Sequence, residues 1–118
     1  MSGRTEFVER ALARLLPMGP VRARAMFGGW GLFLDDVMFA LIAGKRLYFK
    51  VDAETEARFA DAGAQAFTYA RRGARVAMSY REAPTGTLEA AEALLPWAEL
   101  GLDAAWRNRR RKRKKTGR

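Results

Sequence analysis

MFGGWGLFLDDVMFALIAGKRLYFKVD, residues 26–52, is the stretch that decides the fold. Apolar residues fill three closely spaced runs in it. The pairs 35–36 (Asp-Asp) and 44–45 (Gly-Lys) each separate two of these runs, as the two-residue turns of β-hairpins do. The glycine pair at 28–29 permits a backbone bend that residues with a Cβ resist. The stretch therefore predicts strands at about 24–34, 37–43 and 46–51, the first of them bent at its glycine pair.

Helical and strand patterns flank this stretch on both sides. Apolar residues of 5–16 recur at helical spacing, and Thr5 is the expected N-cap. After Asp52 the pattern predicts a short helix over 53–62, strands at about 66–70 and 75–81 joined by a turn at 72–73, and a helical region from 87 toward 110, interrupted at Pro96. The order helix, three strands, helix, two strands, helix predicts a two-layer α+β domain, an antiparallel sheet with helices on one face.

Composition excludes several classes of protein. At 118 residues the chain is expected to be one domain, and no apolar run reaches the ~20 residues of a membrane span. The N-terminus has no apolar signal-peptide core, so the cytoplasm is the expected location. With no histidine and no cysteine, the chain lacks the usual general base at neutral pH, a thiol nucleophile and the preferred zinc ligands. We therefore expect no enzyme, no catalytic residue, no metal and no cofactor.

Positive charge is concentrated at the C-terminal end. Nine of the 22 Lys and Arg residues lie in 107–118, whereas all 13 acidic residues lie in 1–106, so residues 1–106 are formally neutral. We expect a folded domain over 1–106 and a disordered basic tail over 107–118, because the tail has nothing to bury. Such a tail would bind DNA or RNA nonspecifically by releasing counterions, and a merely solubilising tail is the alternative. The expected nucleic-acid-binding residues are Arg107, Arg109, Arg110, Arg111, Lys112, Arg113, Lys114 and Lys115.

The strand expected at 37–43 is apolar on both faces, whereas a half-exposed strand alternates. Either a loop or the last helix covers its second face, or a homodimer forms through the sheet. The residues expected at such an interface are Phe33, Met38, Ala40, Ile42 and Tyr48.

Four other features have both a structural and a functional interpretation, and the structural one is favoured for each. The Gly-Gly-Trp-Gly run at 28–31 lacks the spacing of a phosphate-binding loop and indicates a bulge or tight bend. The acidic residues of 52–56 suit a helix start better than an active site. Lys50 is expected to pack its stem and keep its ammonium in water. Trp97 is assigned to the core, and stacking on bases is the alternative interpretation for Trp106 beside the tail.

Further motifs follow residues 26–52 in a fixed order: Phe67-Thr68-Tyr69, Met78-Ser79-Tyr80, Pro84 and Trp97-Ala98. Together they resemble the N-terminal domain of the TfoX/Sxy family, bacterial proteins associated with regulating natural competence. The resemblance covers about residues 5–106 and implies the same order of elements, in a fold similar to that of secretion chaperones. Full competence regulators of this family carry a second, C-terminal helical domain, and we expect this chain to be the first domain alone.

These observations favour a non-catalytic regulatory or adaptor protein of the TfoX/Sxy N-terminal-domain type. Its neutral domain is expected to bind a protein partner or a second copy of itself, with no membrane involved. Its tail is expected to add nonspecific nucleic-acid affinity, and the resemblance implies a role accessory to transcriptional control. The alternative is a chaperone-like protein–protein interaction module with no nucleic-acid role.

Overall fold

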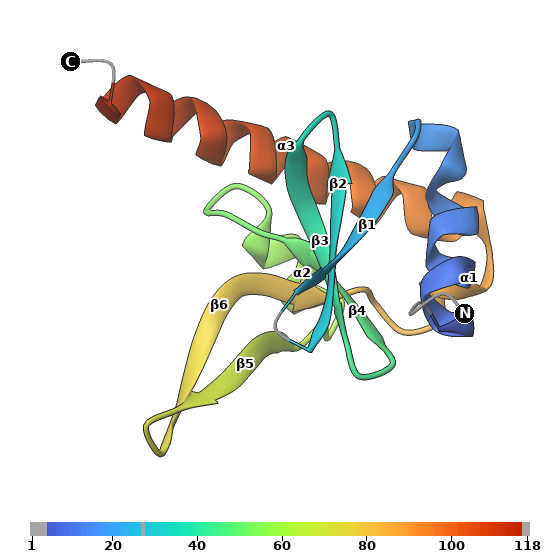
Figure 1. The fold of residues 1–118 in the computed structure, drawn as a ribbon, viewed down its shortest axis with the longest axis horizontal. Helices are drawn as coiled ribbons and strands as arrows, with labels where there is room; N and C mark the ends of the chain where they lie inside the picture. The colour runs from blue at the N-terminus through green and yellow to red at the C-terminus, as the bar shows by residue number, and fades with distance from the viewer. Residues whose placement is uncertain (1–4, 27, 117–118) are drawn as a thin grey trace.

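The computed structural model describes residues 5–26 and 28–116, with the side chains of the last helix described as far as Lys112. Its strands form one antiparallel sheet in the order β1-β2-β3-β4-β6-β5, and the helices cover one face of it (Figure 1). The predicted α+β class is confirmed. The elements are α1 (Glu6–Leu15), β1 (Arg22–Met26), β2 (Gly29–Leu34), β3 (Val37–Ala43), β4 (Arg46–Lys50), α2 (Glu56–Asp61), β5 (Ala66–Arg71), β6 (Ala74–Glu82) and α3 (Ala91–Thr116), with short 3₁₀ turns at Leu16–Met18 and Thr87–Glu89.

The strand predicted at 24–34 is in fact two strands. β1 and β2 pair antiparallel out to the partners Met26 and Gly29, so the expected bend is a complete hairpin turn. Gly28 takes φ +77°, a left-handed conformation that favours glycine. Gly29 lies so close to β3 that a Cβ there would overlap the carbonyl oxygen of Ile42. The glycine pair therefore both turns the chain and lets two strands approach each other.

The two-residue turns expected from the sequence are present. Asp35 and Asp36 have φ +53° and +65°, and their flanking residues pair as the ends of β2 and β3. This is the double positive-φ geometry of a type I′ hairpin turn, in which Asp is tolerated. Arg72 and Gly73 repeat it between β5 and β6, with φ +53° and +81°.

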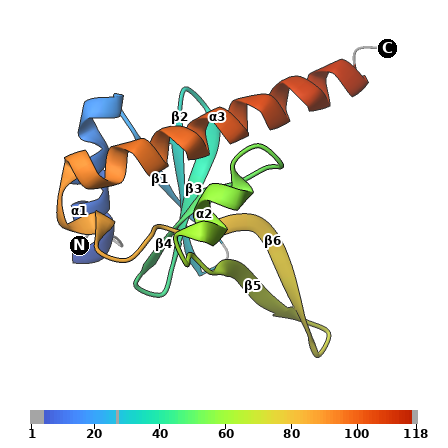
Figure 2. The same cartoon turned by 180° about the vertical axis from the view of Figure 1, so that it is seen from behind.

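The core lies between the sheet and the helices. α1 contributes Val8, Ala11 and Leu15, and the first of these donates its backbone N–H to the Oγ1 of the predicted N-cap, Thr5, at 3.3 Å. On the covered face α3 packs across β3 and β4, and α1 packs beside the first half of α3 (Figure 2). A Cβ on Gly101 of α3 would come within 3.0 Å of Phe49 Cβ, so helix and sheet are in direct contact. No helix of residues 5–26 and 28–116 covers the other face of the sheet.

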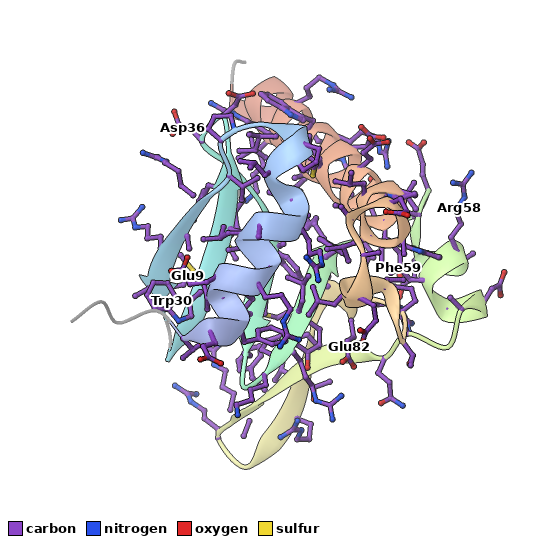
Figure 3. All side chains as sticks on the ribbon, turned by 90° about the vertical axis from the view of Figure 1, so that its right-hand side faces the viewer. Glu9, Trp30, Asp36, Arg58, Phe59 and Glu82 are labelled. Carbon is purple, nitrogen blue, oxygen red and sulfur yellow. The ribbon has the colours of Figure 1, made fainter. Side chains whose placement is uncertain are left out.

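Two aromatic contacts join the helices to this core. Phe59 points from α2 toward α3, whereas its neighbour Arg58 points outward (Figure 3). The Phe59 ring meets Trp97 edge-on at a centroid distance of 4.9 Å. The assignment of Trp97 to the core is therefore confirmed.

Residues expected to form a disordered tail continue the last helix instead. α3 passes through Pro96 and runs as one helix to Thr116, and its last turns extend beyond the sheet (Figure 1). Arg and Lys are good helix formers, and the packed first half of α3 supplies the nucleus that an isolated basic segment lacks. Arg107, the first residue of the expected tail, is also fixed to the domain by an ion pair. In the described part of the chain, no helix is long and apolar enough to cross a membrane.

Candidate functional site

The basic half of α3 is anchored to the loop before α2. The Arg107 guanidinium donates to both carboxylate oxygens of Asp52, from Nε at 2.7 Å and from Nη2 at 3.1 Å. Its Nε also lies 3.2 Å from a carboxylate oxygen of Glu54. The Asp52 side chain further accepts from the Glu54 backbone N–H and from the hydroxyl of Thr55, which is itself 3 % exposed. Sequence analysis assigned Arg107 to nucleic acid, but its charge is already engaged within the domain.

This anchor shifts the pKa of both partners. The hydrogen bonds from Arg107 hold the pKa of the Asp52 carboxyl below its usual range, and the same contact raises the pKa of Arg107. Asp52 is therefore fixed as a carboxylate at neutral pH, with its oxygens engaged by four donors. A helix was expected to start at 52–56 and run over 53–62, whereas α2 spans only Glu56–Asp61 and its N-cap is Thr55. Among the described residues, no group of three or more acidic side chains is placed to hold a metal ion.

The cations that follow on α3 point in different directions. Arg109 and Lys112 are three residues apart, share a side of the helix and line a groove against the sheet. Arg110 and Arg111 do not line that groove and are exposed. Arg109 also lies over the Trp106 ring, 5.4 Å from its centroid. Arg113, Lys114 and Lys115 were also predicted to bind nucleic acid, and their side chains lie outside the described residues.

A β-bulge decides which side of β3 faces the helices. Leu32 pairs with Ala40, but the next residue, Phe33, pairs with Met38, so β3 holds one extra residue at this point. The extra residue shifts the alternation of side chains along the strand. Ala40 (0 % exposed) and Ile42 (2 % exposed) consequently lie in the core, although Ile42 also borders the open face where an interface was expected. The remaining predicted interface residues, Phe33, Met38 and Tyr48, are half-buried.

The open face is hollowed by an apolar cavity of about 480 Å³. Phe67 stacks on Tyr69 at a centroid distance of 6.5 Å, so β5 forms an aromatic wall of the cavity. Phe67 also meets Tyr48 of β4 edge-on at 4.9 Å, but Tyr48 does not line the cavity. Methionine side chains and the buried Tyr80 form much of the remaining cavity lining. The lining residues include Met26, Met38, Leu41, Tyr69, Met78 and Tyr80.

A second hollow of about 490 Å³ adjoins this cavity, because Met38, Met78 and Tyr80 line both. Its other side is formed by α3, including Arg109. Lys50 also lines it, with its ammonium 5.3 Å from the centroid of the Tyr80 ring. We name the second hollow the cationic groove; its charged lining residues are Lys50, Arg109, Lys112 and Asp36.

Burial and neighbouring charges act together on the groove lysine. Burial lowers the pKa of Lys50, and the positive charges of Lys112 and Arg111 lower it further, whereas Asp52 acts in the opposite direction. The expectation that the stem is packed is confirmed, but the ammonium lies over an aromatic ring rather than freely in water. Sequence analysis missed Met78 and Tyr80 as site residues, although the alternating pattern of 75–80 placed them on one face of a strand.

The fold and these surfaces define a small α+β domain with one helix-covered sheet face, one open apolar face and a basic helix end. The chain matches the model of the TfoX N-terminal domain family over residues 13–105 and therefore belongs to that family. It is also similar to the DNA transformation protein TfoX1 of Aliivibrio fischeri (strain ATCC 700601 / ES114), with 35% identity over 72 residues. That match covers 61% of this chain and 34% of the relative, so it spans about a third of the relative's length.

Proposed function

We propose that this protein is a non-catalytic regulatory domain, accessory to transcriptional control, with nonspecific nucleic-acid affinity in the basic half of α3. A competence-related setting is supported by the relative named a DNA transformation protein. The observation that carries the nucleic-acid part is that α3 continues past the sheet as a helix, so that it presents Arg110 and Arg111 to solvent. Exposed cations on a protruding element can meet a phosphate backbone without displacing any part of the fold.

The number of phosphate contacts determines how steeply this affinity falls as the salt concentration rises. Each phosphate neutralised on duplex DNA contributes about −0.9 to the log–log slope of affinity against salt concentration. Contacts from the two arginines therefore account for a slope of about −1.8, and further basic residues steepen it. Such contacts position the protein on the duplex but carry no sequence information. Recognition of a particular promoter is accordingly not part of the proposal.

The test is fluorescence anisotropy with labelled duplex DNA, single-stranded DNA and RNA over a salt series. A double variant, Arg110→Gln with Arg111→Gln, removes the two exposed charges and leaves Arg107 in place. The matched control, Arg71→Gln with Arg72→Gln, makes the same charge change at the tip of the β5–β6 hairpin, at the other end of the molecule from the last turns of α3 (Figures 1 and 2). Truncation at residue 106 is less suitable, because it also removes the partner of Asp52.

We expect the α3 double variant to lose affinity and to show a salt slope smaller by up to about 1.8, with the hairpin variant unchanged. Equal losses in both variants would mean that net charge alone attracts the nucleic acid. Absence of binding by the parent protein near physiological salt would refute the nucleic-acid part of the proposal.

The second candidate is a chaperone-like protein-interaction module, and the open apolar face of the sheet favours it. A homodimer through this face is its simplest form, and Met38 lines the face. Native mass spectrometry of the parent protein and of Met38→Glu tests it directly. A dimeric parent and a folded monomeric variant would support the module, whereas a monomeric parent would rule out the homodimer.

A further inference from the structure

We propose that the apolar cavity and the cationic groove together bind one small amphipathic anion. Its apolar body would lie in the cavity, and its carboxylate or phosphate would lie between Lys50 and Arg109. This inference does not rest on the nucleic-acid proposal, because Arg110 and Arg111 do not line either hollow.

The shape of the site supports a small ligand. A volume of about 480 Å³ for the cavity falls within the ~300–1,000 Å³ range of small-molecule pockets. The cavity and the groove share Met38, Met78 and Tyr80, so a molecule that enters one of them reaches the other. An elongated ligand with one apolar end and one charged end therefore matches the combined outline.

Charge selects an anion for the groove end. Lys50, Arg109 and Lys112 line the groove, and the only acidic residue among its described walls is Asp36. The Asp36 side chain is 81% exposed and forms an ion pair with Arg22 at 3.4 Å. Burial and the neighbouring cations disfavour the charged form of Lys50, and the negative charge of a bound anion would favour it. Charge-assisted hydrogen bonds from ammonium and guanidinium are the usual means of holding a carboxylate or phosphate.

The residues that line the cavity favour a ligand with a hydrocarbon body over one with a nucleobase. Methionine and leucine side chains and aromatic rings form much of the lining. A nucleobase carries several polar edge groups, and each one that is buried without a partner costs about 1–3 kcal/mol. An alkyl or phenyl group incurs no such cost and gains from leaving water. The lining therefore favours a hydrocarbon body over a base.

The hollowed shape of this face favours a small molecule over a second copy as the occupant. Among the described side chains, Leu16 and Met78 are the only large hydrophobics that are exposed, and Leu16 follows α1 on the helix side. A stable dimer buries about 800 Å² on each partner. The apolar residues here line a concavity instead of forming a broad raised patch, which suits a small molecule better.

The experiment titrates the intact protein, labelled with ¹³C at methionine methyl groups, with sodium octanoate, hexyl phosphate and the neutral octanamide. Met38 and Met78 report on the site, and Met18, which packs against the core beside α1, is the internal control. We expect saturable shifts of the two site methyl groups at millimolar or lower octanoate, with Met18 unmoved. Octanamide should bind about tenfold more weakly, because it lacks the charge. Comparing octanoate with hexyl phosphate distinguishes a carboxylate ligand from a phosphate ligand.

Variants test the two ends of the site separately. Lys50→Met should weaken octanoate about tenfold and leave octanamide unchanged, whereas Lys45→Met makes the same change on the exposed β3–β4 turn and should alter neither. Arg109→Gln provides a second test of the anion end should Lys50→Met fail to fold. Met78→Trp, at an exposed position, should block both probes.

Three results would overturn the proposal. The first is the absence of any shift at Met38 and Met78 at millimolar octanoate. The second is equal affinity for octanoate and octanamide, or equal octanoate affinity in the parent and Arg109→Gln. The third is a parent that is dimeric without any probe and whose site methyl groups respond to dilution, because a second copy would then occupy the face.

Discussion

Replacing Asp52 by Asn tests whether the basic half of α3 is held by a single ion pair. The substitution leaves the Arg107 guanidinium with only Glu54, whose side chain is 69% exposed. Breaking a buried pair costs about 3–5 kcal/mol, and breaking an exposed one about 0–1 kcal/mol. The side chains of Asp52 and Arg107 are 11% and 23% exposed, which places the pair between these limits. We expect the free energy of unfolding to fall by about 2 kcal/mol.

The assay is urea unfolding followed by far-UV circular dichroism, in a double-mutant cycle with Arg107→Gln. A coupling energy of about 1.5 kcal/mol is expected for this pair, with unchanged m-values. The matched control is the same cycle at Arg22 and Asp36, which pair at 3.4 Å with side chains 75% and 81% exposed. Its coupling should stay below about 0.5 kcal/mol.

The pH dependence gives an independent check on the same pair. Because Arg107 lowers the pKa of folded Asp52 below its ordinary 3.8, the stabilisation is present above about pH 4 and is lost as pH falls through the folded pKa. The difference in stability between the parent and Asp52→Asn should therefore shrink on acidification. A constant difference down to pH 3, or coupling no larger than at the control pair, would refute the reasoning.

Three other predictions follow from the packing. Gly101→Ala should lower stability by about 1–2 kcal/mol despite the better helix propensity of Ala, because the new Cβ meets Phe49 Cβ at 3.0 Å and the Phe39 carbonyl at 3.1 Å; thermal unfolding measures this. Burial raises the pKa of Tyr80 to about 12. The contribution of the neutral Tyr80 side chain to the free energy of unfolding is therefore complete below pH 10 and should be lost toward pH 12, by up to roughly 2.7 kcal/mol. Unfolding measured against pH should show this loss in the parent but not in Tyr80→Phe. Arg107→Gln should destabilise the fold yet leave the salt slope for duplex DNA unchanged when measured under folding conditions, since its charge is engaged by Asp52.

The sequence contained enough local information for most of the secondary structure. Turn residues at 35–36, 44–45 and 72–73 located the β2–β3, β3–β4 and β5–β6 turns, and the apolar runs beside them indicated the strands. The hairpin between β1 and β2 escaped prediction, because a glycine pair is compatible with both a bend and a full turn. The length of α3 was not predicted either. Composition shows that basic residues repel one another, but it does not show that they continue a helix already packed against the sheet.

The sequence by itself determined the α+β class, the order of helices and strands, and the concentration of positive charge near the C-terminal end. These depend on local periodicity and composition, which a linear chain displays directly. Only the tertiary structure decided that Arg107 belongs to the fold and that a bulge moves Ala40 and Ile42 into the core. It also decided that Lys50 and Arg109 line one groove beside an apolar cavity. Each of these depends on contacts between residues distant in the chain, and strand register and helix direction, rather than residue type, bring such residues together.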